Sequence, residues 1–199
     1  MTTSELPARF HLPLAATVLA AALVLGGGQG TPGDGAVQLL ALALIALVLW
    51  RHAANADAPL PRAAWLAGLV LVLPLLQLFP LPEALWQLPE GRAALVQELG
   101  AAGVQPASRW SLVPMATERA LWWLLPAVAL YLSALQLQAT ERVALLKLLV
   151  LGAGISVVLG LAQLAGGKDS VLRFYALTNP SEAVGFFANR NHLASLLAV

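Results

Sequence analysis

Residues 143–165 read VALLKLLVLGAGISVVLGLAQLA, with Lys147 as the one charged side chain in the run. An apolar stretch of this length is enough for a helix to cross the hydrocarbon core of a bilayer, which takes about 20 residues. Gly152, Ser156 and Gly160 recur four residues apart within it. Small residues at that spacing share one helix face and predict the close approach of another helix. The stretch therefore predicts a transmembrane helix.

The composition of the whole chain favours a membrane protein. Of its 199 residues, 59% are hydrophobic and 11% are charged, and the mean hydropathy is +0.79. Soluble domains carry about 25% charged residues. A net charge of +1 offers no basis for nucleic-acid binding. The chain has no cysteine, which removes disulfide and thiolate chemistry, and its three histidines lack the spacing of metal ligands.

Further apolar blocks lie on both sides of this stretch and predict an all-α fold. We expect a polytopic transmembrane helix bundle that forms one domain over residues 1–199. The last block stops after about half a bilayer, which predicts that the chain is the N-terminal part of a longer protein. Prolines inside two blocks predict kinks. The predicted spans are 11–26, 36–50, 63–81, 117–137, 143–165 and the incomplete 189–199, with long polar loops at 83–114 and 166–188.

The distribution of basic residues favours an N-terminus in the cytoplasm. The links on that side are short and basic, with Arg9, Arg51 and Arg142, whereas the loops at 83–114 and 166–188 are long and also acidic. Positive charge concentrates in the short cytoplasmic links of membrane proteins. Both long loops are therefore expected on the outer side of the membrane.

The first long loop contains a short apolar pattern with two interpretations. Leu95, Val96 and Leu99 fall on one side of a predicted helix, and Trp86 and Trp110 flank it. Such a segment can lie on the membrane surface. An ordinary amphipathic loop helix explains the pattern equally well. Polar residues inside the spans, Tyr131 and Gln163, are expected to bridge helices.

The second long loop runs into the most informative segment, residues 185–194, which read GFFANRNHLA. A helix N-terminus presents unpaired N–H groups and the positive end of the helix dipole. Arg190 and His192 add cationic side chains there, and together these groups could bind a phosphate or diphosphate. A simpler interpretation has Asn189 or Asn191 capping the helix while Arg190 and His192 reach lipid headgroups.

The same segment resembles a known family. Gly185–Ala194 looks like the Asn-Arg-Asn-His segment of the O-antigen ligase-related family, which includes lipopolysaccharide O-antigen ligases and related polysaccharide polymerases. Two weaker matches lie upstream. Arg109–Pro114, followed by Ala116 and Thr117, resembles the family's approach to its next span. Leu78–Pro82, followed by Trp86, is similar to the Pro-rich exit of its third span.

The resemblance implies a membrane glycosyltransferase with a glycosyltransferase C-like helical fold in the bacterial inner membrane. Its donor would be a glycan on undecaprenyl diphosphate at the periplasmic face. Its acceptor would be lipid A-core or another polysaccharide, and no metal, nucleotide or other cofactor would be needed. Arg190 would bind the donor diphosphate, with His192, Asn189 and Asn191 as further candidates. The family's catalytic base lies in a later outer loop, expected downstream of Val199, so residues 1–199 alone are expected to be inactive.

Arg173, beside Phe174 and Tyr175 in the second loop, is a further candidate for contacting a sugar or phosphate. An interfacial anchor explains this group as well.

Two other functions stay open. Pro74 and Pro126 could mark the broken helices of a transporter or flippase. Against this, the chain shows no internal repeat, and its charged cluster lies at a helix mouth rather than at the membrane midplane. A noncatalytic membrane protein of envelope assembly is the third possibility.

Overall fold

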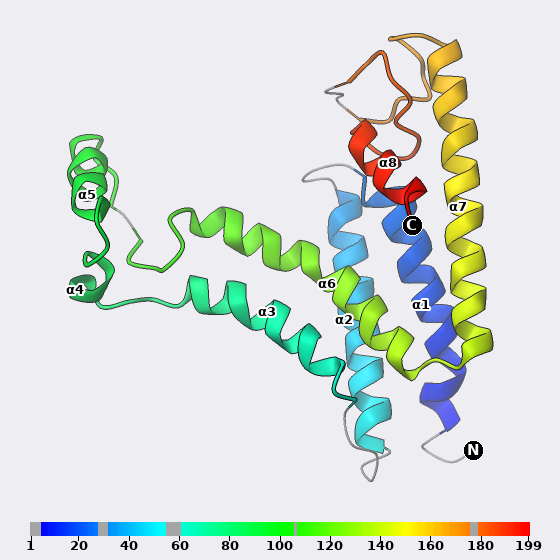
Figure 1. Cartoon of the computed structure of the whole chain (residues 1–199), viewed down its shortest axis with the longest axis horizontal. Helices are drawn as coiled ribbons and strands as arrows, with labels where there is room; N and C mark the ends of the chain where they lie inside the picture. Colours follow the sequence, from blue (N-terminus) through cyan, green and yellow to red (C-terminus); the bar gives the residue numbers. More distant parts are fainter. Residues whose placement is uncertain (1–4, 28–31, 55–60, 106, 176–178) are drawn as a thin grey trace. The chain divides into compact units, whose positions relative to one another are not determined.

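The computed structural model describes residues 5–27, 32–54, 61–105, 107–175 and 179–199. Over these residues the chain is all-helical and no strand forms, which confirms the predicted all-α class (Figure 1). The helices are α1 Glu5–Leu25, α2 Pro32–Ala54, α3 Ala64–Leu78, α4 Glu83–Trp86, α5 Arg92–Ala101, α6 Pro114–Gln136, α7 Ala139–Ala165 and α8 Arg190–Leu197.

The chain divides into two compact units. The first unit comprises residues 1–61 and 125–199, and the second comprises residues 62–124. The boundary falls inside α6, so the two halves of that helix belong to different units.

Among the described residues, α2 and α7 are long and apolar enough to cross a membrane. The apolar part of α1, residues 9–25, and α3 are shorter. The outward face of α7 is strongly apolar: Val150, Val158 and Leu161 are 70%, 68% and 60% exposed. Large aliphatic side chains that project away from the protein in this number suit contact with lipid better than contact with water.

In the first unit, α1 packs against α2 and α7 (Figure 1). Its buried positions, Ala15 and Val18, meet a core to which α2 contributes Ala41 and Leu44. The close helix approach predicted for the small residues of α7 is present at Gly152. A Cβ added there would lie 2.7 Å from Cδ1 of Leu23 on α1. A larger residue at this position would therefore push the two helices apart.

Polar contacts tie the end of α6 to the other helices of the first unit. Ser133 Oγ and His11 Nε2 are 2.8 Å apart, and both side chains are fully buried. His11 Nδ1 has no hydrogen-bond partner within the described part of the chain. One turn later, Gln136 Nε2 donates to the carbonyl of Val48 on α2 at 3.1 Å. A buried polar group is costly unless it is paired, so these contacts restrict how α6 can lie on α1 and α2.

In the second unit, the segment that follows α3 pairs with the segment that precedes α6. Leu81 N donates to Ser108 O at 2.7 Å, and Ser111 N donates to Gln77 O at 2.8 Å. These two bonds fix the ends of the 83–114 region against each other.

The guanidinium of Arg92, at the start of α5, closes the same region. It donates to the carbonyls of Arg109 at 3.0 Å and Trp110 at 2.7 Å, and it lies 5.2 Å from the ring centroid of Trp86. Trp86 is buried, whereas Trp110 is 65% exposed. The predicted short helix is present as α5, and its Leu95, Val96 and Leu99 are half-buried.

Replacing Ser133 by alanine should destabilise the first unit, because His11 would lose its partner at Nε2. Interhelical hydrogen bonds in membranes average about 0.6 kcal/mol and reach about 1.7 kcal/mol. We expect a loss near the upper value, because both side chains are fully buried. Reversible unfolding in mixed micelles measures it. Ser195→Ala removes an exposed hydroxyl that bonds only to the carbonyl of Asn191. An equal loss in that control would contradict the explanation.

Candidate functional site

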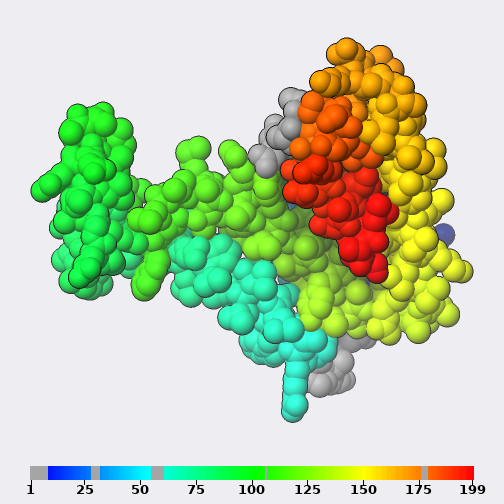
Figure 2. Space-filling view, turned by 45° about the horizontal axis from the view of Figure 1, so that its top comes forward, coloured from blue at the N-terminus to red at the C-terminus, as the bar shows by residue number. Residues whose placement is uncertain are grey.

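The described parts of the segment between α7 and α8, residues 166–175 and 179–189, fold back over the last turns of α7. Figure 2 shows this 166–189 loop and α8, coloured orange to red, lying against α7. Ala188 N donates to Gly27 O at 3.0 Å. A Cβ added to Gly27 would lie 2.5 Å from the carbonyl oxygen of Phe186. The link after α1 and the 166–189 loop therefore meet at the same end of the first unit.

Gln163, near the end of α7, holds the loop in place through hydrogen bonds of its side-chain amide. Its Nε2 donates to the carbonyls of Leu172 at 3.0 Å and Gly185 at 2.8 Å. Its Oε1 accepts from Val184 N at 3.2 Å and Gly185 N at 2.9 Å. The side chain is fully buried, and these four bonds use both donors and both acceptor positions of the amide. Gln163 thus holds a loop, where the sequence predicted a bridge to another helix.

The small residues of α7 receive the same loop. Gly185 has φ +59°, and a Cβ there would overlap Ser156 Oγ. That hydroxyl accepts a hydrogen bond from Phe186 N at 3.2 Å. One turn further on, a Cβ on Gly160 would lie 3.0 Å from the Cβ of Ala183. Of the three small residues predicted to meet a helix, Gly152 does so, whereas Ser156 and Gly160 meet the 183–186 backbone.

Arg173 spans the loop with a half-buried guanidinium. Its Nε donates to Gly167 O at 3.1 Å, its Nη1 to Glu182 O at 3.1 Å and its Nη2 to Gln163 O at 3.4 Å. Three backbone carbonyls on different parts of the loop and α7 therefore share one cation. The geometry gives Arg173 a role in holding the loop together.

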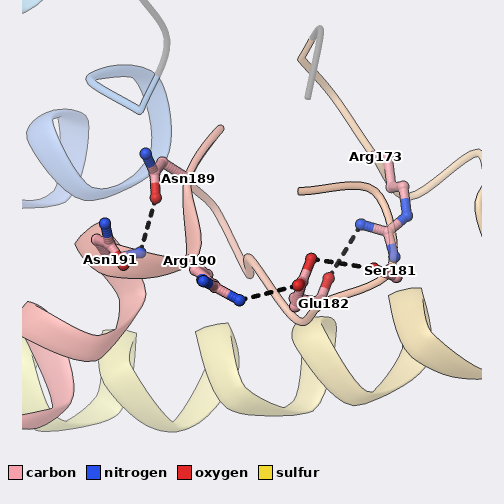
Figure 3. Close-up of polar contacts among 6 residues, drawn as sticks. All are labelled: Arg173, Ser181, Glu182, Asn189, Arg190 and Asn191. Carbon is pink, nitrogen blue, oxygen red and sulfur yellow. Dashed lines mark hydrogen bonds and ion pairs between the residues drawn. The ribbon is translucent and has the colours of Figure 1, made fainter. Parts of the chain in front are cut away.

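Arg190, the first residue of α8, contacts the loop through an ion pair with a side chain, whereas Arg173 contacts backbone carbonyls. Its Nη1 lies 2.9 Å from Oε1 of Glu182, and the two side chains are 54% and 35% exposed. Ser181 Oγ donates to the other carboxylate oxygen of Glu182 at 3.2 Å. Figure 3 shows Glu182 between the two arginines, with its carbonyl bonded to Arg173 and its carboxylate to Arg190. Arg190 is thus a half-exposed cation with one acidic partner.

The remaining candidates surround the start of α8. Asn189 is the N-cap, and its Oδ1 accepts from Asn191 N at 2.8 Å. Capping by Asn189 is therefore confirmed. His192 is exposed and meets the ring of Phe187 edge-on, with centroids 6.1 Å apart. Figure 3 shows the Asn189 and Asn191 side chains on the far side of the helix start from the Arg190 guanidinium.

Tyr175 links the loop to the end of α1. Its hydroxyl donates to Val24 O at 3.5 Å. Burial raises the pKa of Tyr175 above its ordinary value, and the negative charge of Asp34 raises the pKa further, while a backbone hydrogen bond at Gly27 opposes the shift. The phenol is therefore neutral in this contact.

This arrangement suits the binding of an anion. Arg190 supplies an exposed guanidinium at the positive end of a helix, whereas Asn191 and His192 are exposed on other sides of the same helical turn. Across the described residues, no three His, Asp or Glu side chains gather as a metal site.

The sequence did not single out Glu182, and it singled out Gln163 without its true partner. Glu182 was one of several acidic loop residues, and nothing in its spacing eight residues before Arg190 predicts their contact. Gln163 did carry a signal, because a glutamine inside an apolar helix needs partners, but the sequence does not say which.

Replacing Gly185 by alanine should disorder the 183–189 backbone. A left-handed backbone costs a non-glycine residue about 1–2 kcal/mol, and the overlap with Ser156 adds to that. Hydrogen exchange at Val184, Gly185 and Phe186 should accelerate by tenfold or more. Gly154→Ala on α7 is the matched control, because a Cβ there meets nothing within 4 Å. Unchanged exchange in Gly185→Ala would contradict this account.

Comparisons with protein-family models, with curated proteins and with solved structures found no match for this chain. The geometry around α8 and the Asn-Arg-Asn-His segment are therefore the two features of the chain that bear on its function.

Proposed function

We propose that this chain belongs to a membrane glycosyltransferase of O-antigen ligase or polymerase type in the bacterial inner membrane. Its role would be to bind the diphosphate of an undecaprenyl-linked glycan at the periplasmic face, for transfer to lipid A-core or another polysaccharide. The observation that carries the proposal is the exposed guanidinium of Arg190 at the start of α8, inside the Asn-Arg-Asn-His segment that resembles this family.

The proposed membrane domain contains more helices than α2 and α7. We propose that α1, α3 and α6 also cross the bilayer, that α8 begins a sixth span, and that the fold is glycosyltransferase C-like. The 23 residues of α6 are long enough, and the apolar part of α1, residues 9–25, reaches the lower end of the usual length of about 17–25 residues. The 15 residues of α3 rise about 22 Å at 1.5 Å per residue, short of a hydrocarbon core of about 30 Å. Its crossing would therefore need local thinning of the bilayer.

Charge supports an outward-facing 166–189 loop. The end of the first unit opposite that loop carries Arg9, Arg51 and Arg142. The basic residues at the loop end, Lys168, Arg173 and Arg190, are instead spread along the long connection after α7 and the start of α8, together with Asp169 and Glu182. The positive-inside tendency therefore favours a cytoplasmic position for the N-terminus and a periplasmic position for α8.

In the proposed reaction, Arg190 binds the diphosphate leaving group. As the bond from the sugar to the diphosphate breaks, negative charge grows on the phosphate oxygens, and a guanidinium can stabilise it through two parallel hydrogen bonds. His192 and Asn191 are exposed in the same first turn of α8, on other sides than the Arg190 guanidinium, so we assign the diphosphate to Arg190 first. The resemblance assigns the base that activates the acceptor hydroxyl to a later outer loop.

Arg190→Ala in the complete protein should reduce glycan transfer by 100-fold or more, the usual loss when a charge-stabilising donor is removed. Membrane insertion should be unaffected. Glycan transfer in cells that lack the native gene is the measurement. Lys168→Ala removes another exposed cation of the same loop and should leave transfer near normal. Normal transfer by Arg190→Ala would remove Arg190 from the donor site.

The orientation can be tested by cysteine labelling, because the chain contains no cysteine of its own. A single cysteine in place of His192 should react with a membrane-impermeant maleimide applied to spheroplasts. A single cysteine in place of His52, at the end of α2, should react only after the membrane is opened. The reverse pattern would put α8 in the cytoplasm, away from a periplasmic donor.

A further inference from the structure

We propose that Glu182 is a displaceable counter-ion of Arg190, which occupies the guanidinium in the empty site and yields it to the diphosphate. This inference rests on the proposed function and adds a competitor to the same site. Glu182 would then lower the affinity of the site both for the undecaprenyl-linked donor and for the undecaprenyl diphosphate that is released after transfer.

Glu182 is held more firmly than the guanidinium of Arg190, and this difference favours the exchange of Glu182 for a diphosphate. The backbone of Glu182 is fixed by Arg173 Nη1 at 3.1 Å, and its carboxylate also accepts from Ser181 at 3.2 Å. The guanidinium of Arg190 is bonded to Glu182 at 2.9 Å and is 54% exposed. The cation can therefore turn from the carboxylate to an incoming anion while the loop keeps its shape.

The strength of the pair also suits an exchange. Contacts between half-exposed charges change an equilibrium by about fivefold at most. A diphosphate offers more charge than one carboxylate and can accept two parallel bonds from the guanidinium. It can therefore replace Glu182, whereas a pair buried away from water would resist separation.

The position of Glu182 argues against the role of a general base. In a single inverting displacement, the acceptor hydroxyl attacks the sugar from the face opposite the leaving group, so its base belongs on that far side. Glu182 contacts the very guanidinium that would bind the leaving diphosphate. It therefore stands on the leaving-group side and competes with that group. Weaker binding of the product helps turnover, because product release limits many enzymes.

The experiment measures binding of farnesyl diphosphate to the purified protein in phosphatidylcholine nanodiscs at low ionic strength. We expect Glu182→Gln to bind about three to five times more tightly than the native chain. Glu182→Asp keeps the charge but shortens its reach, so its affinity should lie between the two. Asp169→Asn removes one charge from an exposed position in the same loop and should change affinity little.

Two further variants separate this inference from the proposed function. Arg190→Ala should lose most of the affinity, and Arg190→Ala combined with Glu182→Gln should regain none of it. If Arg190→Ala weakens binding but Glu182→Gln leaves the affinity unchanged or lower, the counter-ion proposal is overturned and the donor site stands. If Arg190→Ala binds as tightly as the native chain, the donor site itself is wrong.

Discussion

The buried amide of Gln163 is the constraint on which the candidate site depends. An amide surrounded by apolar side chains is costly unless all its hydrogen-bonding positions are used, and here the loop supplies every partner. The same four bonds place the backbone of Val184 and Gly185 against α7. Five residues later the chain begins α8, so the position of Arg190 follows from a side chain that never meets the surface. A single polar residue in a hydrophobic helix thus gives the long connection before α8 a defined position.

The two arginines, Arg173 and Arg190, differ in how far their guanidinium groups are used within the fold. Arg173 gives its guanidinium to three carbonyl groups and holds Glu182 in place through one of them. Arg190 meets the same acidic residue from the other side, through the side chain, and stays half-exposed. One cation is thereby committed to the fold while the other is available to solvent. An anion that approaches α8 would meet Arg190 first, with the loop already organised behind it.

Sequence reasoning predicted the parts of this structure that arise from local chemistry. Long apolar blocks indicate helices whatever surrounds them, and Asn189 caps α8 because its side chain needs only its own neighbours. Sequence reasoning could not predict the contacts between segments that are distant along the chain. Small residues such as Ser156 and Gly160 accept a helix or a loop equally well, so their spacing could not predict the 183–186 backbone as their partner. The pairing of Glu182 with Arg190 depends on the path of the intervening loop, which local pattern does not encode.

The contact between Gly27 and the 186–188 backbone links the beginning of the chain to its end. During synthesis, the hairpin of α1 and α2 leaves the ribosome long before residue 188 is made. The surface around Gly27 then has no partner until α7 has been made and the loop has folded onto it. The site at α8 is consequently a late product of biogenesis. Its assembly would tolerate a pause in translation after α2 only if the hairpin of α1 and α2 keeps its structure in the meantime.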